Sequence, residues 1–360
     1  MTNHHRHHHG HDSTGGGRGA HQHDHADVPT RGLAWVWRWL VDLFGGHSHD
    51  HGDSRGDLED SRQGMRALSI SLGGLGVTAL IQAAVVVVSG SVALLADTIH
   101  NVSDALTAIP LGVAFLLARR QPTRRYTYGY GRAEDLAGIF IVAVIALSAV
   151  VAAWQAVERL VDPREIHQAG WVAVAGLVGF LGNEAVAGYR LRVGRRIGSA
   201  ALVADGLHAR TDGLTSLAVL GAGLGSLAGW PLADPLIGLA ISLAITRVLR
   251  IAARDIYRRL MDGVDPQIVD HITHQLTTTP GVRGIDRVRV RWIGHRLHVD
   301  ADIVLDAHLP LTRAHDILED ARHSLLHHVP RLADALLHAS PTHDTGPDPH
   351  ALTHHHLATN

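Results

Sequence analysis

One pattern of acidic residues and histidine occurs twice in this chain of 360 residues. The two copies are Asp97-x-x-His100-x-x-x-Asp104 and Asp205-x-x-His208-x-x-x-Asp212. At 3.6 residues per turn, the three side chains of each copy fall within about 60° on one helix face. Two such faces turned toward each other would surround a divalent metal ion with oxygen and nitrogen ligands.

Both copies lie inside long apolar segments, where ionisable side chains are costly. Each costs roughly 3 kcal/mol at bilayer depth on insertion scales, so matched sets indicate a metal or proton pathway. His100 with Asp104, and His208 with Asp212, have the i, i+4 spacing that stacks two side chains over one turn. Two imidazoles and two carboxylates suit tetrahedral Zn²⁺, and by ligand type Co²⁺ or Cd²⁺, whereas an all-oxygen set would favour Mn²⁺ or Mg²⁺.

The same ligands would couple metal movement to protons, because they must lose or lack a proton to bind metal. Histidine titrates near pH 6.5, so the exchange falls in the physiological range, and a proton gradient could drive the ion outward. Asp97 and Asp205 could support the ligands or relay protons, or they could instead cap or pair structurally. Arg210 falls on another face, where we expect it to pair with a carboxylate or to extend its charge toward water.

The elements that must position these residues are six apolar runs. They lie near residues 67–89, 92–118, 136–157, 170–191, 199–228 and 232–253. Each has the ~20 residues that cross ~30 Å of hydrocarbon, and their Gly, Ala and Ser content lets helices approach closely. Basic residues follow the second, fourth and sixth runs, among them Arg119, Arg190 and Arg250. The sequence therefore predicts a six-helix all-α membrane bundle over 65–258 with both termini in the cytoplasm.

The region from 262 to 340 has the pattern of a small soluble α+β domain. A helix is predicted over 266–278, a hairpin of strands over 285–293 and 297–305, a second helix over 311–328 and a last strand over 333–339. The order αββαβ is compatible with an open sheet covered by two helices on one face, as in ferredoxin-like or metallochaperone-like domains.

The two ends of the chain are predicted to be disordered tails. Residues 1–60 and 341–360 are polar and contain many of the 30 histidines, and such segments cannot bury enough apolar area to fold. The tails either form a local buffer of weakly bound metal or are solvated segments without function. A Trp-rich segment over 33–44 would lie in the membrane interface or pack on the folded body. Nothing in the first thirty residues resembles the apolar core of a signal peptide.

Composition excludes several other functions. The absence of cysteine removes disulfides, thiolate metal sites and cysteine nucleophiles. The net charge of -2 gives no pull toward nucleic acid. A membrane-embedded metallohydrolase would want a motif such as His-Glu-x-x-His, which does not occur, and a metal sensor would leave the charged spans without a purpose. The sequence therefore favours a secondary transporter over an enzyme.

Four motifs together resemble the cation diffusion facilitator family. They are the segments 95–104 and 204–212, which carry the two copies, Tyr128-Gly129-Tyr130-Gly131-Arg132-Ala133-Glu134, and Asp234-Pro235. The resemblance covers about residues 65–340. It implies a homodimeric, proton-coupled exporter of Zn²⁺ and similar ions in a bacterial inner or plasma membrane, with a cytoplasmic domain that dimerises and binds regulatory metal.

The resemblance also implies roles for particular residues. The membrane metal site of zinc-type members falls on His100, Asp104, His208 and Asp212. Metal-binding positions of the cytoplasmic domain fall on Asp286, Asp302, His315 and His338, although some of them are His where this chain has Asp. The loop 124–130 lacks good ligands, so the further metal site of some members is expected to be missing. Arg132 and Asp262 match a charge interlock between the membrane and cytoplasmic parts.

Overall fold

The computed structural model describes residues 56–89, 108–161, 169–230, 232–342 and 351, all within one compact unit, 48–360. The predicted tails and the Trp-rich segment fall outside the described residues, apart from the start of the first helix, residue 351 and the end of the last strand. Asp97, His100 and Asp104 also fall outside, so the first copy of the repeated motif carries no structural account.

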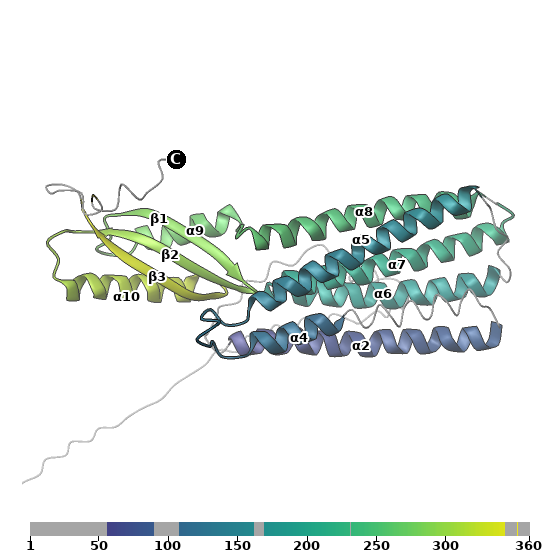
Figure 1. Cartoon of the computed structure of the whole chain (residues 1–360), viewed down its shortest axis with the longest axis horizontal. Helices are drawn as coiled ribbons and strands as arrows, with labels where there is room; N and C mark the ends of the chain where they lie inside the picture. The colour runs from purple at the N-terminus through teal and green to yellow at the C-terminus, as the bar shows by residue number, and fades with distance from the viewer. Residues whose placement is uncertain (1–55, 90–107, 162–168, 231, 343–350, 352–360) are drawn as a thin grey trace, which may run out of the picture. The chain divides into compact units, whose positions relative to one another are not determined.

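The membrane part is a bundle of long helices (Figure 1). Its described helices are α2 (Gly56–Ser89), α4 (Ala108–Ala118), α5 (Arg132–Val161), α6 (Ala169–Ile197), α7 (Ala200–Leu227) and α8 (Ala233–Leu260). Each overlaps one of the six predicted apolar runs, although only 108–118 of the second run is described. Helix α2 begins at Gly56, before the predicted run, so the prediction of a disordered tail was wrong for residues 56–60. Helices α5, α6 and α8 also continue beyond the predicted runs, because their charged ends stay helical outside the apolar stretch.

Four of these helices, α2, α5, α6 and α8, are long and apolar enough to cross a membrane. Helix α7 is equally long but carries Asp205, Arg210 and Asp212, which lower its apolar character. The described part of α4 is a shorter apolar helix. Many apolar side chains on the outside are exposed, including Leu243 at 73% and Trp154 at 72%, as expected for a surface that faces lipid.

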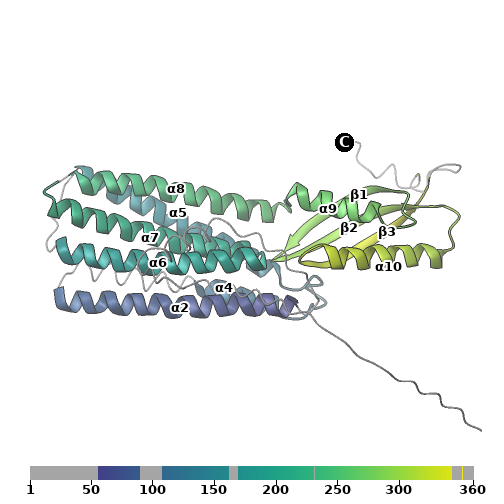
Figure 2. The same cartoon turned by 180° about the vertical axis from the view of Figure 1, so that it is seen from behind.

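Helices α6 and α7 make the most extensive contact of the bundle and lie side by side in both views (Figure 2). Small residues permit this approach. A Cβ atom added at Gly176 would stand 2.6 Å from the backbone nitrogen of Leu220, and one at Gly194 would stand 2.9 Å from that of Val203. The backbones of the two helices therefore nearly touch at both levels, as the Gly content predicts.

The α+β region confirms the predicted order αββαβ. Its elements are α9 (Pro266–Thr277), β1 (Gly284–Ile293), β2 (Arg296–Leu305), α10 (Leu311–His328) and β3 (Leu332–Pro341). The sheet order is β1-β2-β3, with β1 and β2 antiparallel and β2 and β3 parallel.

One face of this sheet is buried under both helices. Burial alternates along β2, with Val299, Ala301 and Ile303 inside, which is the period of two expected for a strand with one covered face. These residues share a core with Ile272 of α9 and Ala321 of α10. The alternate residues of β2 lie on the uncovered face.

Candidate metal transport site and its junction with the sheet

Helix α7 positions the second copy of the motif. Its start is fixed by Ser199, whose side chain accepts a hydrogen bond from the backbone N–H of Leu202 at 3.0 Å, a standard N-cap. From there the helix is uninterrupted, so Asp205, His208 and Asp212 lie on one face. All three are buried, with exposures of 0%, 1% and 4%.

His208 and Asp212 lie together as their spacing predicts. The distance from His208 Nδ1 to Asp212 Oδ1 is 3.7 Å. Two side chains do not fill the coordination shell of a divalent ion, and the described residues bring no group of three His, Asp or Glu side chains together for a metal. The other half of the predicted set, His100 and Asp104, lies outside the described residues, so the four-residue site stays a prediction.

Asp205 forms a fully buried ion pair with Arg190 of α6. Arg190 Nη1 lies 3.0 Å from Asp205 Oδ2, and the two side chains are 1% and 0% exposed. Of the two roles that the sequence left open for Asp205, structural pairing is therefore present, and proton relay stays a prediction. The sequence interpretation was wrong about Arg190, which lies inside α6 instead of flanking the apolar run.

Arg210 pairs with a carboxylate, as expected, and its partner is Glu184 of α6. Arg210 donates from Nε to Glu184 Oε2 at 3.2 Å, and its Nη2 contacts Oε1. The side chains are 24% and 17% exposed. Helices α6 and α7 are therefore joined by two ion pairs, one fully buried at the level of Asp205 and one partly buried at the level of Arg210.

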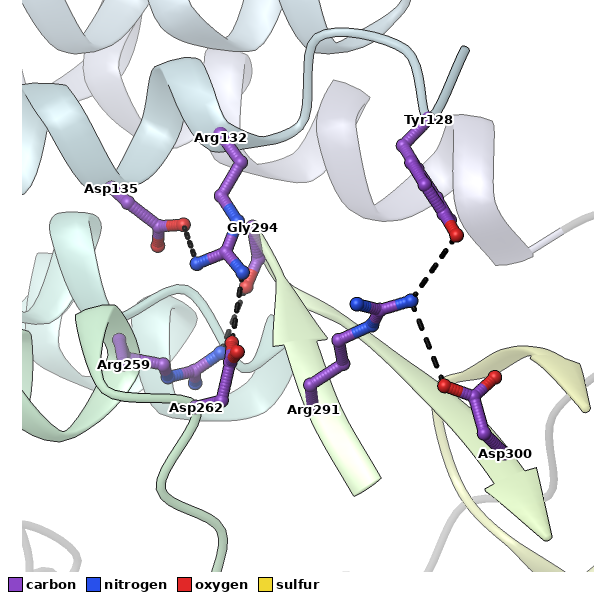
Figure 3. Close-up of polar contacts among 8 residues, drawn as sticks. All are labelled: Tyr128, Arg132, Asp135, Arg259, Asp262, Arg291, Gly294 and Asp300. Atoms are coloured by element: carbon purple, nitrogen blue, oxygen red, sulfur yellow. Dashed lines mark hydrogen bonds and ion pairs between the residues drawn. The ribbon is translucent and has the colours of Figure 1, made fainter. Parts of the chain in front are cut away.

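The predicted interlock residues also meet. Arg132 at the start of α5 lies 2.8 Å from Asp262, just after α8, and 3.6 Å from Asp135 (Figure 3). The side chains of Arg132 and Asp262 are 44% and 48% exposed. Such a pair contributes only about 0–1 kcal/mol by itself. Its proposed role as an interlock therefore depends on the contacts around it.

Those contacts come from the tip of the β1–β2 hairpin. Arg259 of α8 donates to the carbonyl oxygen of Gly294 at 2.8 Å and to that of Gly198 at 2.7 Å. Its guanidinium also lies 4.0 Å from the centroid of the Trp292 ring. Gly294 has a φ of 61°, and a Cβ atom there would stand 2.9 Å from the Gly131 carbonyl oxygen. Only glycine fits this position without strain.

A buried His–Glu pair completes the junction, and the sequence reasoning missed it. His295 Nδ1 lies 2.9 Å from Glu134 Oε2, with side chains 6% and 2% exposed. Burial lowers the pKa of His295, but the hydrogen bond and the charge of Glu134 outweigh it, so the pKa is raised. The sequence analysis predicted only a turn at Gly294-His295. The signals that could have indicated this pair were the histidine in that turn and Glu134 at the end of the motif over 128–134.

The residues proposed for a cytoplasmic metal site do not assemble in the described chain. Asp302 and His338 are neighbours in register on β2 and β3, and Asp302 lies 2.7 Å from Arg287. His315 is exposed on α10, the helix that covers the opposite face. Asp286 lies at an irregularity of β1. The set therefore stays a prediction, and we derive no step of transport from it.

Comparisons with known proteins identify the class. The family model described as the cation efflux transmembrane domain matches residues 68–261, and the cation efflux cytoplasmic domain matches residues 264–342. A membrane helix bundle with buried acid–histidine pairs and a small α+β domain is thus an integral membrane transporter of divalent metal cations, not an enzyme. The chain belongs to the cation efflux family, also known as the cation diffusion facilitators.

Similar proteins from three organisms support this assignment to a class. The chain is 59% identical over 303 residues to a "probable cation efflux system protein" of Mycobacterium tuberculosis, covering 84% of this chain and 91% of that one. It is 28% identical over 326 residues to the zinc transporter ZitB of Escherichia coli, covering 86% and 99%. It is 27% identical over 328 residues to metal tolerance protein 2 of Oryza sativa, covering 83% and 84%.

Proposed function

We propose that this protein exports divalent cations from the cytoplasm in exchange for protons, with Zn²⁺ as the main substrate and Cd²⁺ and Co²⁺ as further substrates. Transport proceeds by alternating access around an intramembrane site made of His100, Asp104, His208 and Asp212. The ion is cargo, bound on one side of the membrane and released on the other.

The observation that carries this proposal is the buried pair on α7. His208 and Asp212 are nearly inaccessible, 3.7 Å apart, and part of a membrane bundle. A carboxylate and an imidazole are costly in such a place unless an ion or a proton occupies them. One nitrogen and one oxygen donor per helix suit zinc, and the Escherichia coli relative is named as a zinc transporter.

Proton coupling follows from the same donors. Each must be free of a proton to bind the cation, and each can take a proton when the cation leaves. Asp205 and Asp97 are candidates to support the ligands or pass protons, Asp205 while held by Arg190. A proton gradient across the membrane would therefore protonate the site after the cation leaves. The empty, protonated site would then turn back toward the cytoplasm.

We further propose that different segments of the chain have different roles. Residues 65–258 transport the ion, and residues 262–340 dimerise two copies and respond to metal. Asp286, Asp302, His315 and His338 are separate candidate ligands for that metal, since no three of them come together in the described chain. The His-containing segments 1–60 and 341–360 buffer metal near the site. Both termini lie in the cytoplasm, and the membrane is the bacterial inner or plasma membrane.

Zinc flux in proteoliposomes tests the transport proposal. The full-length protein is reconstituted in vesicles that contain a zinc-sensitive dye, and a pH gradient is imposed. We expect gradient-dependent zinc entry into the vesicles that falls to the protein-free level in Asp212→Ala and in Asp104→Ala, because each removes one of the four proposed ligands.

The matched control is Asp270→Ala, which removes an exposed carboxylate of α9 and should leave flux unchanged. Unaltered flux in both ligand variants would reject the assigned site. Flux that ignores the pH gradient would reject proton coupling alone. Competition among Zn²⁺, Cd²⁺, Co²⁺ and Mn²⁺ in the same vesicles ranks the substrates.

A further inference from the structure

Four arginines form one stripe along the second half of α8. They are Arg247, Arg250, Arg254 and Arg258, whose spacings of three, four and four residues place them within about 80° of one another around the helix. All four side chains are exposed. The stripe is about 16 Å long, at 1.5 Å per residue. A row of guanidinium groups on one helix face is a surface for anions.

The same face of α8 is apolar toward the start of the helix. Leu239 and Leu243 continue the spacing of the stripe before Arg247, and their side chains are 55% and 73% exposed. The outward face of α8 thus carries leucine in its first half and arginine in its second half. An amphiphile with an acyl chain and an anionic head group matches this order of side chains.

Contacts with α5 give the depth of the stripe. A Cβ atom added at Gly138 would stand 2.5 Å from Ile256 Cδ1, and one at Gly238 would stand 3.3 Å from Ala156 Cβ. The two helices are therefore antiparallel, with Gly138 level with Ile256 and Ala156 level with Gly238. The two contacts are separated by the same number of residues on each helix, so the levels between them follow residue by residue.

At the level of the stripe, the outside of α5 is apolar. By this register Phe140 is level with Arg254, and Leu147 is level with Arg247. The two α5 side chains are 45% and 64% exposed, as expected in hydrocarbon. The stripe therefore extends to membrane depth and is not confined to the water beyond it. Charged side chains at such depth are costly unless they reach a counter-ion.

The counter-ion does not come from the described part of the chain. There, the ion pair of α8 joins Asp234, in its first turn, to Arg159, and no ion pair uses the four arginines. A second copy of the chain does not suit the stripe either, because a two-fold contact through it would bring guanidinium groups against guanidinium groups. The phosphates of lipid head groups are the counter-ions that remain at this depth.

We propose that the stripe binds an anionic phospholipid, with the head group on the four arginines and an acyl chain along the exposed leucines of α8. Guanidinium groups bind phosphate oxygens through paired hydrogen bonds. Basic residues at the end of a membrane helix attract anionic lipid, with about a fivefold preference for each residue. The site lies on another helix from His208 and Asp212, and it does not depend on the proposed transport function.

Quenching by labelled lipids tests this proposal, and the absence of cysteine makes a single label possible. Ile251→Cys, at an exposed position beside the stripe, carries a fluorescent dye in the full-length protein. The protein is reconstituted in phosphatidylcholine vesicles with a small, equal fraction of doxyl-labelled phosphatidylglycerol or doxyl-labelled phosphatidylcholine. We expect the quenching to show phosphatidylglycerol enriched about fivefold or more at the dye.

Loss of charge from the stripe should remove the enrichment. In Arg250→Gln with Arg254→Gln, the two labelled lipids should quench the dye within about twofold of each other. Arg250→Lys with Arg254→Lys keeps the charge and should keep most of the enrichment. If the double Gln variant fails to accumulate, Arg254→Gln alone should still lower the enrichment by about twofold or more.

Arg192→Gln with Arg196→Gln is the matched control. Both arginines are exposed near the end of α6, so this variant loses the same charge from another helix. The enrichment at the α8 dye should then equal that of the wild type. An equal loss in the α6 and α8 variants would show a general effect of protein charge and would overturn the site.

Other occupants of the stripe give other results. If neither lipid quenches the dye, protein covers this face, as in a contact with a second copy, and the lipid assignment is wrong. If inorganic phosphate at millimolar concentration abolishes the enrichment and chloride at the same ionic strength does not, the stripe binds free phosphate instead. The quenching is measured without zinc, so a failure of the transport proposal leaves this result unaffected.

Discussion

At the scale of single residues, the buried Arg190–Asp205 pair decides how α6 and α7 fit together. Both side chains are inaccessible, with a separation of 3.0 Å. Two opposite charges in such a buried place attract each other strongly. Either charge alone would be buried without water or a counter-ion, which costs free energy. The pair therefore makes the two helices depend on each other three residues before His208.

Removal of one partner should cost far more than removal of both. We predict that Arg190→Leu destabilises the protein by about 3–5 kcal/mol, because Asp205 keeps a buried charge without a counter-ion, and that Arg190→Leu with Asp205→Leu recovers most of this loss. Thermal unfolding of the detergent-solubilised full-length protein measures both.

A second ion pair serves as the control. Arg159 Nη1 lies 2.8 Å from Asp234 Oδ1, but the arginine side chain is 46% exposed. Arg159→Leu should therefore cost no more than about 1 kcal/mol. Equal losses in the single and double Arg190 variants would contradict the prediction.

At the scale of elements, the tip of the β1–β2 hairpin joins the sheet to the ends of α5 and α8. Arg259 donates to the Gly294 carbonyl oxygen, and His295 contacts Glu134. Arg291 donates to the Tyr128 hydroxyl at 3.4 Å (Figure 3). The exposed Arg132–Asp262 pair lies at the same junction as the buried His295–Glu134 pair. The hairpin tip thus gives the weak interlock a fixed geometry.

The attachment of the hairpin should weaken as pH rises. The pKa of His295 is raised above 6.5 in the folded state, since Glu134 outweighs the effect of burial, with Asp60 adding to the rise and Arg259 opposing it. A raised pKa stabilises the folded state fully below pH 6.5, and this stabilisation is lost as pH rises through the folded-state pKa.

Hydrogen exchange of the amides around the hairpin tip, corrected for intrinsic rates, measures this effect in the full-length protein. Protection in the wild type should fall as the pH is raised from 6.5 through the folded-state pKa of His295, and His295→Gln should abolish the change. His298→Gln is the control, because burial lowers the pKa of His298. A pH response that persists in His295→Gln would place the titrating group elsewhere.

At the scale of the whole molecule, the positions of the α7–α8 turn and the sheet region allow the orientation in the membrane to be tested. The α7–α8 turn lies at the opposite end of α8 from the sheet region, which follows Leu260. If the sheet region is cytoplasmic, as we propose, then the turn after α7 faces the outside. The absence of cysteine makes this easy to test by labelling.

Single cysteines introduced at two exposed positions should label differently in intact cells. We predict that a membrane-impermeant thiol reagent reacts with Ala228→Cys, in the turn between α7 and α8, but with Ala307→Cys, after β2, only once the membrane is opened. The unmodified protein gives the blank. Labelling of Ala307→Cys in sealed cells would reverse the proposed orientation and with it the direction of export.

The sequence by itself determined which side chains share a face within a single helix or strand. The i, i+4 spacing on α7 predicted that His208 and Asp212 lie together, and alternation predicted β1 and β2, because local periodicity fixes which side chains share a face. Apolar length predicted the helices that build the bundle.

Only the tertiary structure decided which faces meet. The sequence predicts Arg190 as a charge that flanks the apolar run, whereas α6 turns it toward Asp205. No pattern in the sequence pairs His295 with Glu134. Gln82 of α2 and Ser216 of α7 meet at Gly179 of α6, although the three helices are separate in sequence. Their convergence depends on how glycine-lined helices rotate and approach one another, and that is set by packing over whole helix surfaces.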